Sequence, residues 1–279
     1  MPVSDRELAA ALGWSAVRRE PWARASSAPM ALLRSPEGAR ALLKELGAAL
    51  GPRPRFAADP RRELAAYGRL PAAAAAPRCL AADPDGAWLV LELLDGVTLA
   101  EAGTLDAWEQ AARTLARLHA APLPDGDRLL RHDAAHLSRW VERALAAEPA
   151  LRVAEPAARA AVARLAALPA VLVHGEAYPA NVVVAGGRVR LVDWETAGPG
   201  PGVLDLAALT SGAWEPGERA RVVAAYRDAA VIPPEDADLG AARLLVACQW
   251  LGWSPTWTPP PAHRHDWLGD VLALTGGSA

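Results

Sequence analysis

The sequence contains almost no lysine, little cysteine and no long apolar run. The two cysteines, Cys79 and Cys248, are far apart and lack the close spacing of metal ligands, which argues against a cysteine-based metal site. Pro, Arg or Glu interrupts the alanine-rich segments, so no stretch reaches the length of a membrane span. The first residues show no basic region followed by an apolar one. We therefore expect a cytoplasmic protein without a membrane partner.

Neither sign of charge is in large excess, since the formal net charge is only -3. This balance excludes the strongly basic character of nucleic-acid-binding and polybasic membrane-binding proteins. Hydrophobic residues make up 52% of the 279 residues, enough for a large core in one bilobal unit or two modest domains. The expected partner is a small molecule.

Of the 29 basic residues, 28 are arginines, and Lys44 is the one lysine. A planar guanidinium cannot replace a compact ammonium group where a site needs a point charge, and phosphate binding is one such use of lysine. Lys44 is therefore a candidate phosphate-binding residue. The alternative is a surface lysine without a special role.

Residues 15–44 have the pattern of antiparallel strands joined by short connections. Strands are expected over residues 30–34 and 40–44, because the intervening Ser35-Pro36-Glu37-Gly38 has the Pro and Gly positions of a type I turn. Lys44 then ends a strand. The loop before these strands contains Ser26 and Ser27, whose backbone N–H groups are candidates for covering phosphates, although the loop has no glycine pattern.

A helix is expected after Asp59, a favoured N-cap residue, with Pro60 at its first position. Helical spacing gives it a buried stripe of Glu63, Ala66, Tyr67 and Leu70. A buried carboxylate needs a cationic or hydrogen-bonding partner, and Lys44 on the neighbouring sheet supplies one. We expect an ion pair between Lys44 and Glu63. The alternative is that Glu63 borders the stripe and meets Arg62 or solvent.

The chain changes from strand to helix after residue 92. Residues 88–91 form an apolar run too short for a helix, and Glu92, Leu93 and Leu94 lead to a turn at Asp95-Gly96, where we place a hinge. A helical pattern follows Thr104, the expected N-cap.

This helical pattern reaches His119, which is expected to be a hydrogen-bonded core histidine rather than a ligand. Residues 125–170 are expected to form further helices. The proline-rich residues 199–202 and 259–261 are expected to be loops.

Residues 171–195 carry the densest pattern of polar residues between apolar runs. The Gly186-Gly187 pair between two β-rich runs predicts a two-residue hairpin turn. If Ala185 pairs with Arg188, counting back along both strands pairs Asn181 with Val192. The hairpin therefore brings Asn181 beside the strand end that bears Asp193.

One amide oxygen and one carboxylate suit a hard cation such as Mg²⁺, which also keeps positions for water and substrate phosphates. Asn181 and Asp193 are therefore candidate metal ligands, with a nucleotide bound beside the metal. Glu176, in the loop before Asn181, is a candidate base for an attacking hydroxyl group. Taken singly, Asn181 also fits a turn former, Asp193 a strand-end cap and Glu176 a solvated charge.

These residues also carry a family resemblance. His174-Gly175-Glu176 with Asn181, followed by Asp193-Trp194-Glu195 and Asp205, resembles the aminoglycoside phosphotransferase and choline kinase superfamily. Residues 115–120 resemble the recurrent Leu-Ala-x-Leu-His helix of that superfamily, and residues 61–67 resemble its N-lobe helix. The resemblance covers nearly the whole chain and is most specific between His174 and Asp193.

The resemblance implies an α+β, bilobal, protein-kinase-like fold. Residues 1–94 would form an N-lobe with a small antiparallel sheet and one helix, and residues 95–279 a larger, mostly helical C-lobe. The N-lobe would bind ATP or GTP, and the C-lobe would hold the catalytic residues and a small-molecule acceptor. The implied activity is Mg²⁺-dependent transfer of the γ-phosphoryl group to a hydroxyl group of a sugar, antibiotic or other natural product.

On the nucleotide side, the resemblance implies that Lys44 contacts the α- and β-phosphates and that Glu63 orients it. The backbone of Glu92, Leu93 and Leu94 would face the purine.

On the catalytic side, the resemblance implies that Asn181 and Asp193 hold Mg²⁺. Glu176 would be the catalytic base, with His174 bracing the catalytic loop. Asp205 would tie the following helix to that loop by hydrogen bonds.

The sequence departs from the family pattern at position 176, where Asp is usual and this chain has Glu. The extra methylene moves the carboxylate by about 1 Å, which can cost about a hundredfold in rate where geometry is demanding. Phosphoryl transfer depends mainly on positioning and charge stabilisation, which softens the objection. Two alternatives therefore stay open: a kinase acting on Ser or Thr of a peptide, and a nucleotide-binding pseudokinase, to which Glu176 points.

The acceptor is expected between residues 125–170 and the tail from Leu244. The tail includes Trp250, Trp253, Trp257 and Trp267, for which core packing is favoured over stacking on a ligand. Acidic residues near 125–133 are interleaved with Arg128 and Arg131, which argues against a polycationic aminoglycoside. The oligomeric state is unknown at this stage.

Overall fold

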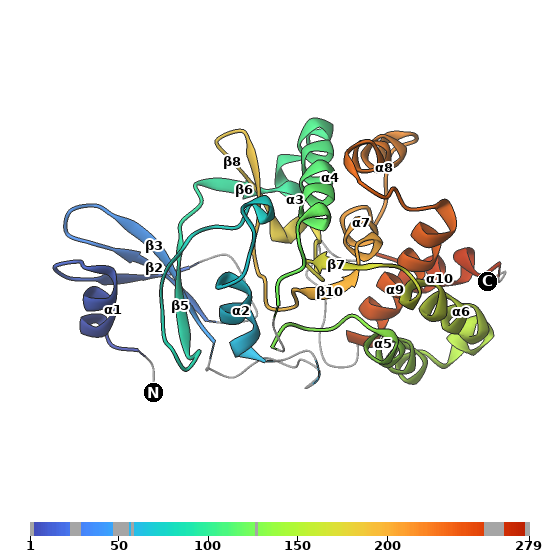
Figure 1. Cartoon of the computed structure of the whole chain (residues 1–279), viewed down its shortest axis with the longest axis horizontal. Helices are drawn as coiled ribbons and strands as arrows, with labels where there is room; N and C mark the ends of the chain where they lie inside the picture. Colours follow the sequence, from blue (N-terminus) through green and yellow to red (C-terminus); the bar gives the residue numbers. More distant parts are fainter. Residues whose placement is uncertain are drawn as a thin grey trace.

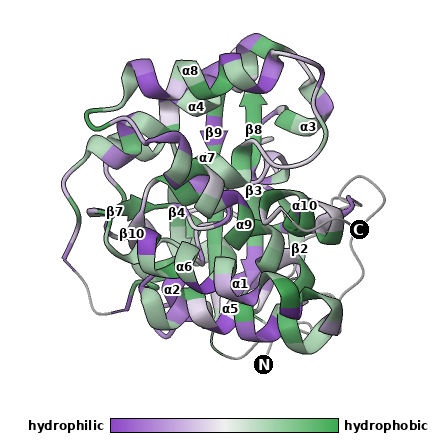
Figure 2. Cartoon of the chain, turned by 90° about the vertical axis from the view of Figure 1, so that its right-hand side faces the viewer, coloured by the Kyte–Doolittle hydropathy of each residue, from purple (hydrophilic) through white to green (hydrophobic). Residues whose placement is uncertain are grey.

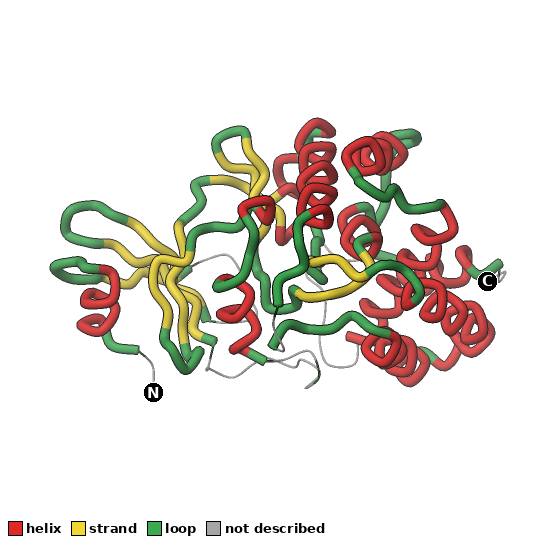
Figure 3. Tube along the Cα trace, viewed as in Figure 1, coloured by secondary structure: helices red, strands yellow, loops and turns green. Residues whose placement is uncertain are grey.

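The strands gather mainly at one end of the molecule and most of the helices at the other (Figure 1, Figure 3). The computed structural model describes residues 3–22, 29–46, 56, 59–125, 128–253 and 265–276. The strands are β1 (Arg18–Pro21), β2 (Met30–Arg34), β3 (Arg40–Glu45), β4 (Cys79–Ala82), β5 (Trp88–Glu92), β6 (Gly96–Thr98), β7 (Ala170–Val173), β8 (Val182–Ala185), β9 (Arg188–Leu191) and β10 (Gly198–Pro201).

The helices stand before, between and after groups of these strands, and the last four follow β10. The α-helices are α1 (Asp5–Leu12), α2 (Pro60–Tyr67), α3 (Leu99–Ala102), α4 (Leu105–Ala120), α5 (Ala134–Ala147), α6 (Glu155–Ala166), α7 (Val203–Leu209), α8 (Glu218–Ala229), α9 (Asp236–Trp253) and α10 (Trp267–Leu274). Short 3₁₀ turns are η1 (Ala72–Ala74), η2 (Pro149–Ala154) and η3 (Pro179–Asn181).

The larger sheet is antiparallel and has five strands in the order β1-β2-β3-β5-β4. The turn between β2 and β3 is the expected one, because the N–H of Gly38 donates to the carbonyl oxygen of Ser35 at 3.1 Å. The expected helix is α2, where the Asp59 side chain accepts from the N–H of Arg61. One helix was expected in this part of the chain, and α1, capped by Ser4, is an additional one.

Two small sheets lie between this sheet and the helical end. One is β6-β8-β9 and the other is the pair β10-β7. The expectation of a loop at residues 199–202 is wrong in part, because Gly198–Pro201 pairs with Ala170–Val173. The prolines are tolerated because β10 pairs with one strand only, so the missing N–H groups cost few ladder hydrogen bonds.

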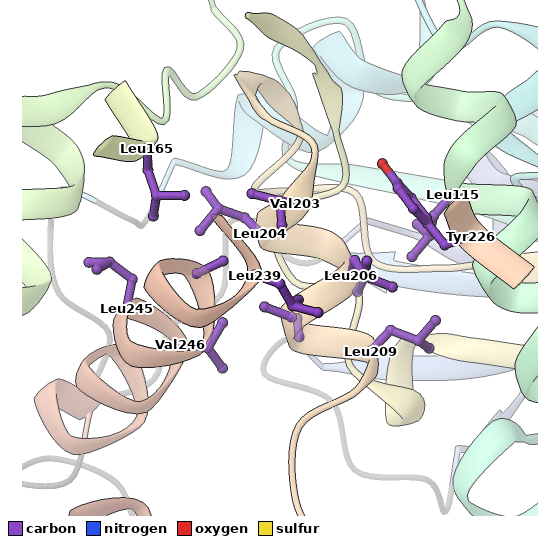
Figure 4. Close-up of a cluster of buried hydrophobic side chains, with 14 of the residues drawn as sticks. Leu115, Leu165, Val203, Leu204, Leu206, Leu209, Tyr226, Leu239, Leu245 and Val246 are labelled. Atoms are coloured by element: carbon purple, nitrogen blue, oxygen red, sulfur yellow. The ribbon is translucent and has the colours of Figure 1, made fainter. Parts of the chain in front are cut away.

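The largest core surrounds α7, which is buried along its whole length. Figure 4 shows apolar side chains of α7, α8 and α9 meeting Leu115 and Leu165 from flanking helices. In the end-on view of Figure 2, α8 lies at the top and α5 at the bottom, with α7 between them. The buried polar exception on α7 is Asp205, which is 0% exposed.

The helices expected from the sequence are present at α4, α5 and α6. Thr104 precedes α4 at the N-cap position, but its side chain makes no capping hydrogen bond. No helix within the described ranges is both long and apolar enough to cross a membrane. The α+β architecture with an antiparallel sheet at one end and a helical region at the other confirms the expected fold class.

Candidate active site

The ammonium group of Lys44 lies between two carboxylates. Its Nζ is 2.7 Å from Oε2 of Glu63 on α2 and 2.6 Å from Oδ1 of Asp193, just after β9. Glu63 is 0% exposed and Lys44 is 3% exposed, so the Lys44–Glu63 ion pair is shielded from water. The ion pair expected from the sequence is therefore confirmed, and the contact with Asp193 is an addition to it.

The two carboxylates keep Lys44 charged. Burial by itself lowers the pKa of Lys44, but the negative charges of Asp193 and Glu63 and their hydrogen bonds outweigh it, so the pKa is raised. A lysine that is protonated and fixed in a buried position is a suitable point charge for a phosphate group.

The hairpin register agrees with the count made from the sequence. Ala185 pairs with Arg188 and Val182 with Leu191, around the Gly186-Gly187 turn. Both glycines have positive φ, of 55° and 73°, as a type I′ turn requires. One step further along, the N–H of Val192 donates to the carbonyl oxygen of Asn181 at 2.9 Å. Asn181 therefore lies at the strand end from which Asp193 follows.

Asp193 has an unusual backbone conformation, with φ of 68°. Left-handed φ values are uncommon for residues other than glycine and cost free energy that the surrounding structure must supply. Here the side chain is held by Lys44, and the next residue, Trp194, is fully buried with Nε1 donating to the carbonyl oxygen of Leu191 at 2.9 Å. The fold thus holds the Asp193 carboxylate beside Lys44 in a strained conformation.

His174 braces the loop that carries Glu176. Its Nδ1 accepts from the N–H of Glu176 at 3.3 Å, so its Nε2 carries the proton and donates to the carbonyl oxygen of Val192 at 2.9 Å. Burial lowers the pKa of His174, which keeps the ring neutral. The residue is 0% exposed, and so the geometry gives it a positioning role.

Asp205 ties this loop to α7. Its carboxylate accepts from the N–H of His174 at 2.6 Å and from the N–H of Gly175 at 2.8 Å. His119 reaches the same carboxylate through Nε2 at 3.0 Å and contacts the hydroxyl of Tyr226 through Nδ1 at 2.6 Å. Burial raises the pKa of Asp205. The hydrogen bonds that its carboxylate accepts from His119 and from the N–H of His174 outweigh burial, so the pKa is lowered overall. His119 is the hydrogen-bonded core histidine that the sequence predicted.

Glu176 projects from a loop whose main chain is held on both sides. Its carbonyl oxygen accepts from Nδ2 of Asn181 at 2.9 Å and from the N–H of Tyr178 at 2.7 Å. Because the amide nitrogen of Asn181 is used in this way, Oδ1 is the atom of that side chain that remains able to bind a metal. The loop therefore couples the position of Glu176 to that of Asn181.

A small hollow of about 20 Å³, room for about one water molecule, lies beside Glu176, between its loop and helices α5, α7 and α9. It is lined mainly by apolar side chains, together with His132, His136, Thr196 and Gln249. Burial lowers the pKa of His132, and burial together with the nearby His132 lowers the pKa of His136 to about 3. Both rings are therefore neutral near pH 7, and this wall of the hollow carries no positive charge from histidine.

Carboxylate oxygens of Glu63, Asp193 and Glu195 lie within 4.8 Å of one another. Carboxylate oxygens, like the Oδ1 of Asn181, are hard oxygen donors of the kind that Mg²⁺ prefers. The residues present therefore fit a magnesium ion bound with a polyphosphate. Glu195 is buried, and its part in this cluster was not predicted, although it stands in the Asp193-Trp194-Glu195 motif.

The backbone of Glu92 was expected to face the purine, but its N–H group already has a partner within the protein. Its N–H donates to the carbonyl oxygen of Arg78 at 2.8 Å, and its carboxylate accepts from the N–H of Arg78 and from Arg190. The Glu92 amide is therefore already used inside the sheet. Leu93 and Leu94 follow the end of β5 and are half-buried.

Two of the candidate residues, Ser26 and Ser27, lie outside the described residues, as does Trp257. Of the other tail tryptophans, Trp250 stacks on Trp267 with ring centroids 5.2 Å apart, and Trp253 lies 5.4 Å from Trp140. His132 was not predicted from the sequence. It donates through Nε2 to the carbonyl oxygen of Thr196 at 2.8 Å and packs under the catalytic loop, a contact for which its sequence neighbours give no signal.

A family model described as the phosphotransferase enzyme family matches residues 20–245. The match includes the Lys44, Glu63, catalytic-loop and Asp193 segments, and it confirms the family resemblance predicted from the sequence. No curated protein matches the chain in a sequence comparison.

Solved structures of several small-molecule kinases share the fold. Choline kinase LicA from Streptococcus pneumoniae superposes with a TM-score of 0.73 at 16% identity, covering 97% of both chains. A putative fructosamine-3-kinase from Thermobifida fusca gives a TM-score of 0.67 at 18% identity, covering 98% of this chain and 96% of the other. Macrolide 2'-phosphotransferase MphH from Brachybacterium faecium gives 0.59 at 20% identity, covering 98% of each. The TM-scores and coverages show a common fold, and at identities of 16–20% they show the fold alone.

Proposed function

Because the chain belongs to the phosphotransferase enzyme family, we propose that it transfers the γ-phosphoryl group of ATP or GTP, in the presence of Mg²⁺, to a hydroxyl group of a small molecule. The observation that carries this proposal is the position of Lys44 Nζ between Glu63 and Asp193, next to the loop of Glu176 and Asn181. A buried cation, oxygen ligands for a metal and a carboxylate that can orient the attacking hydroxyl group are the parts that phosphoryl transfer needs.

In this proposal Lys44 binds the α- and β-phosphates while Glu63 holds it from the opposite side. The 2.7 Å contact with fully buried Glu63 supports this, since Glu63 restrains the ammonium group when Asp193 turns to a metal. The base of the nucleotide would meet the backbone of Leu93 and Leu94, because the Glu92 amide already donates to Arg78. We also propose that residues 1–94 form the nucleotide-binding N-lobe and residues 95–279 the C-lobe.

Asn181 and Asp193 would hold the metal, with Oδ1 of the amide and one carboxylate oxygen directed to it. Mg²⁺, when bound, would neutralise charge on the phosphate groups. The protein's part is to keep both ligands in place, which the Asn181 hydrogen bond to Glu176 and the strained Asp193 backbone support.

Glu176 would accept the proton of the acceptor hydroxyl as its oxygen attacks the phosphorus atom. Hydrogen bonds to the carbonyl oxygen of Glu176 fix its main chain, so the side chain alone has to reach the acceptor. The acceptor hydroxyl would reach the half-buried Glu176 from solvent, because the hollow beside it, of about 20 Å³, has room for about one water molecule.

A second candidate is a nucleotide-binding pseudokinase, favoured by one observation. Glu176 stands where Asp is usual in the family pattern, and its carboxylate is one methylene further from the main chain. In that case Lys44, Asn181 and Asp193 would still bind metal and nucleotide, without transfer.

Nucleotide binding and turnover separate the two candidates. Thermal shift with ATP or GTP, with and without Mg²⁺, measures binding, and phosphate transfer is then assayed with a panel that includes choline, a fructosamine and a macrolide, acceptors of the structural relatives. We expect metal-dependent binding, transfer to at least one hydroxyl compound, and a loss of about 10²–10⁴-fold in turnover for Glu176→Gln.

The matched control is Glu142→Gln, which changes an exposed glutamate on α5. It should behave as the wild type. Metal-dependent binding without turnover for any acceptor would favour the pseudokinase. Absence of metal-dependent nucleotide binding would refute both candidates.

A further inference from the structure

A second cavity, of about 470 Å³, lies between α8 and the beginning of α9 and is lined by three arginines. Arg219 and Arg227 come from α8, and Arg243 comes from α9. Trp214, Val223 and Leu239 provide apolar surface in the same cavity. Figure 1 places α8 and α9 at the end of the molecule remote from the five-stranded sheet, so the cavity is separate from the Lys44 site.

Among the residues that the structure describes, Arg219 and Arg243 lack a carboxylate partner in direct contact. Nε of Arg219 and Nε of Arg243 are buried and have no hydrogen-bond partner within the described ranges. Arg219 donates only through Nη2, to the carbonyl oxygen of Gly212, and across the described part of the chain neither guanidinium forms an ion pair with a carboxylate. A buried donor without an acceptor, and a buried charge without a counter-charge, both cost free energy.

The arginines also repel one another. Burial lowers the pKa of Arg243, and the charges of Arg219 and Arg227 lower it further. Burial lowers the pKa of Arg219 as well. Arginine nevertheless stays protonated in proteins, so these positive charges persist and the cavity has a positive potential.

The nearby carboxylates are already engaged. Asp236 accepts from Arg227 at 2.6 Å and is largely exposed, and Asp270 is bonded to Nε2 of His265 at 2.8 Å. Their charges raise the pKa of Arg243, but less than burial and the other arginines lower it. Glu215, on the rim of the cavity, is exposed. The positive potential around Arg219 and Arg243 is therefore left for another anion.

We propose that this cavity binds a small organic anion, with a phosphate or carboxylate group between Arg219 and Arg243 and an apolar body against Trp214. Guanidinium groups bind such oxyanions by paired, charge-assisted hydrogen bonds. The cavity has the size of many small-molecule sites. Trp214 offers a fixed face, because Nε1 donates to the carbonyl oxygens of Thr210 and Ser211 and its ring packs edge-on against Trp108 at 4.7 Å.

Calorimetric titration with phenyl phosphate, benzoate and phenol tests the proposal on the whole chain. Saturable binding is expected for one or both anions and not for phenol, because phenol lacks the charged group. Phenyl phosphate alone would identify a phosphate site, and benzoate alone a carboxylate site. Arg243→Gln should weaken binding by about tenfold or more, the equivalent of one charge-assisted contact.

Arg152→Gln, which changes an exposed arginine on η2, is the matched control and should bind as the wild type. Arg219→Gln is the second variant, in case Arg243→Gln does not fold, and should weaken binding to a similar extent. The melting temperature of unliganded Arg243→Gln should be no lower than that of the wild type, because an uncompensated charge is removed. No saturable binding of either anion, or binding unchanged in both arginine variants, would overturn the proposal.

Discussion

The side chains of Lys44 and Asp193 are 149 residues apart in the sequence and are joined by a hydrogen bond of 2.6 Å. Lys44 belongs to the five-stranded sheet, and Asp193 follows the β8–β9 hairpin. Arg190 anchors the same hairpin to the segment before β4, donating to the carbonyl oxygens of Ala75 and Ala76 at 3.0 and 2.6 Å. The distance between Lys44, the proposed phosphate-binding residue, and Asp193, the proposed metal ligand, is therefore set by how the sheet and the hairpin pack.

Lys44→Met should reduce the free energy of unfolding by about 3–5 kcal/mol at pH 7, because it leaves the buried Glu63 carboxylate without its cation, next to Asp193. Urea denaturation measures the change. The double variant Lys44→Met/Glu63→Gln should recover part of the loss, since the uncompensated charge is then removed as well. A single variant as stable as the wild type would show that the ion pair does not stabilise the fold.

Asn181→Asp separates two roles of the amide. An oxygen remains for the metal, but the donor to the Glu176 carbonyl oxygen is lost and a carboxylate faces that oxygen. We expect kcat to fall by roughly ten- to a hundredfold, with a smaller loss in metal-dependent nucleotide binding. Asn181→Ala, which removes both groups, should lose both properties. Identical kinetics for the two variants would contradict a separate role for the hydrogen bond to Glu176.

Protonation of the buried His136 should contribute to the loss of stability at acidic pH. Its pKa is lowered by burial to about 3 in the folded protein, against about 6.5 when unfolded. Below about pH 6.5 the unfolded chain binds a proton that the folded chain does not. Stability is therefore complete above that pH and is lost as the pH falls toward the folded pKa, at about 1.4 kcal/mol per pH unit for this group.

His136→Gln should make the decline between pH 6.5 and 4.5 less steep, by close to one proton's contribution. Glutamine keeps an acceptor for the indole N–H of Trp140, which donates to His136 Nε2 at 3.2 Å. Denaturation at a series of pH values gives the slope for both proteins. An unchanged slope would mean that His136 is protonated in the folded state.

Local rules were sufficient for the parts of the site that depend on short stretches of sequence. The Gly186-Gly187 turn determined the register of its hairpin, and helical spacing put Glu63 on the buried face of α2. The pairing of Lys44 with Glu63 followed because a buried carboxylate needs a cation. These elements required no knowledge of how the two ends of the molecule pack.

Other parts of the site depend on packing between segments distant in the sequence, which spacing alone does not reveal. The contact between Lys44 and Asp193, the left-handed backbone of Asp193 and the bond from His132 to Thr196 belong to this group. The edge strand at Gly198–Pro201 was missed because Pro and Gly are strong turn signals, whereas pairing with β7 overrides that local preference.

Gly175 lies next to Glu176 and is packed against Thr196 and His132, so a substitution there tests the position of Glu176. Its φ is 85°, and a Cβ added there would lie 2.6 Å from the carbonyl oxygen of Thr196 and 2.8 Å from Cε1 of His132. In Gly175→Ala, alanine would have to adopt this unfavourable left-handed conformation, and its Cβ would clash with the atoms next to Glu176. The expected loss of stability is about 2–4 kcal/mol. The expected loss of turnover is about a hundredfold, if the clash moves Glu176 by 1 Å.

Gly187→Ala is the control that separates these effects, because Gly187 has φ of 73° in the hairpin turn and nothing within 4 Å of its added Cβ. That variant should lose only about 1–2 kcal/mol from the left-handed conformation and keep normal turnover. Steady-state kinetics at a temperature where both variants are folded measures the difference. Normal turnover in Gly175→Ala would mean that the loop tolerates displacement. Glu176 would then not be the base, since proton transfer requires it within hydrogen-bond reach of the acceptor.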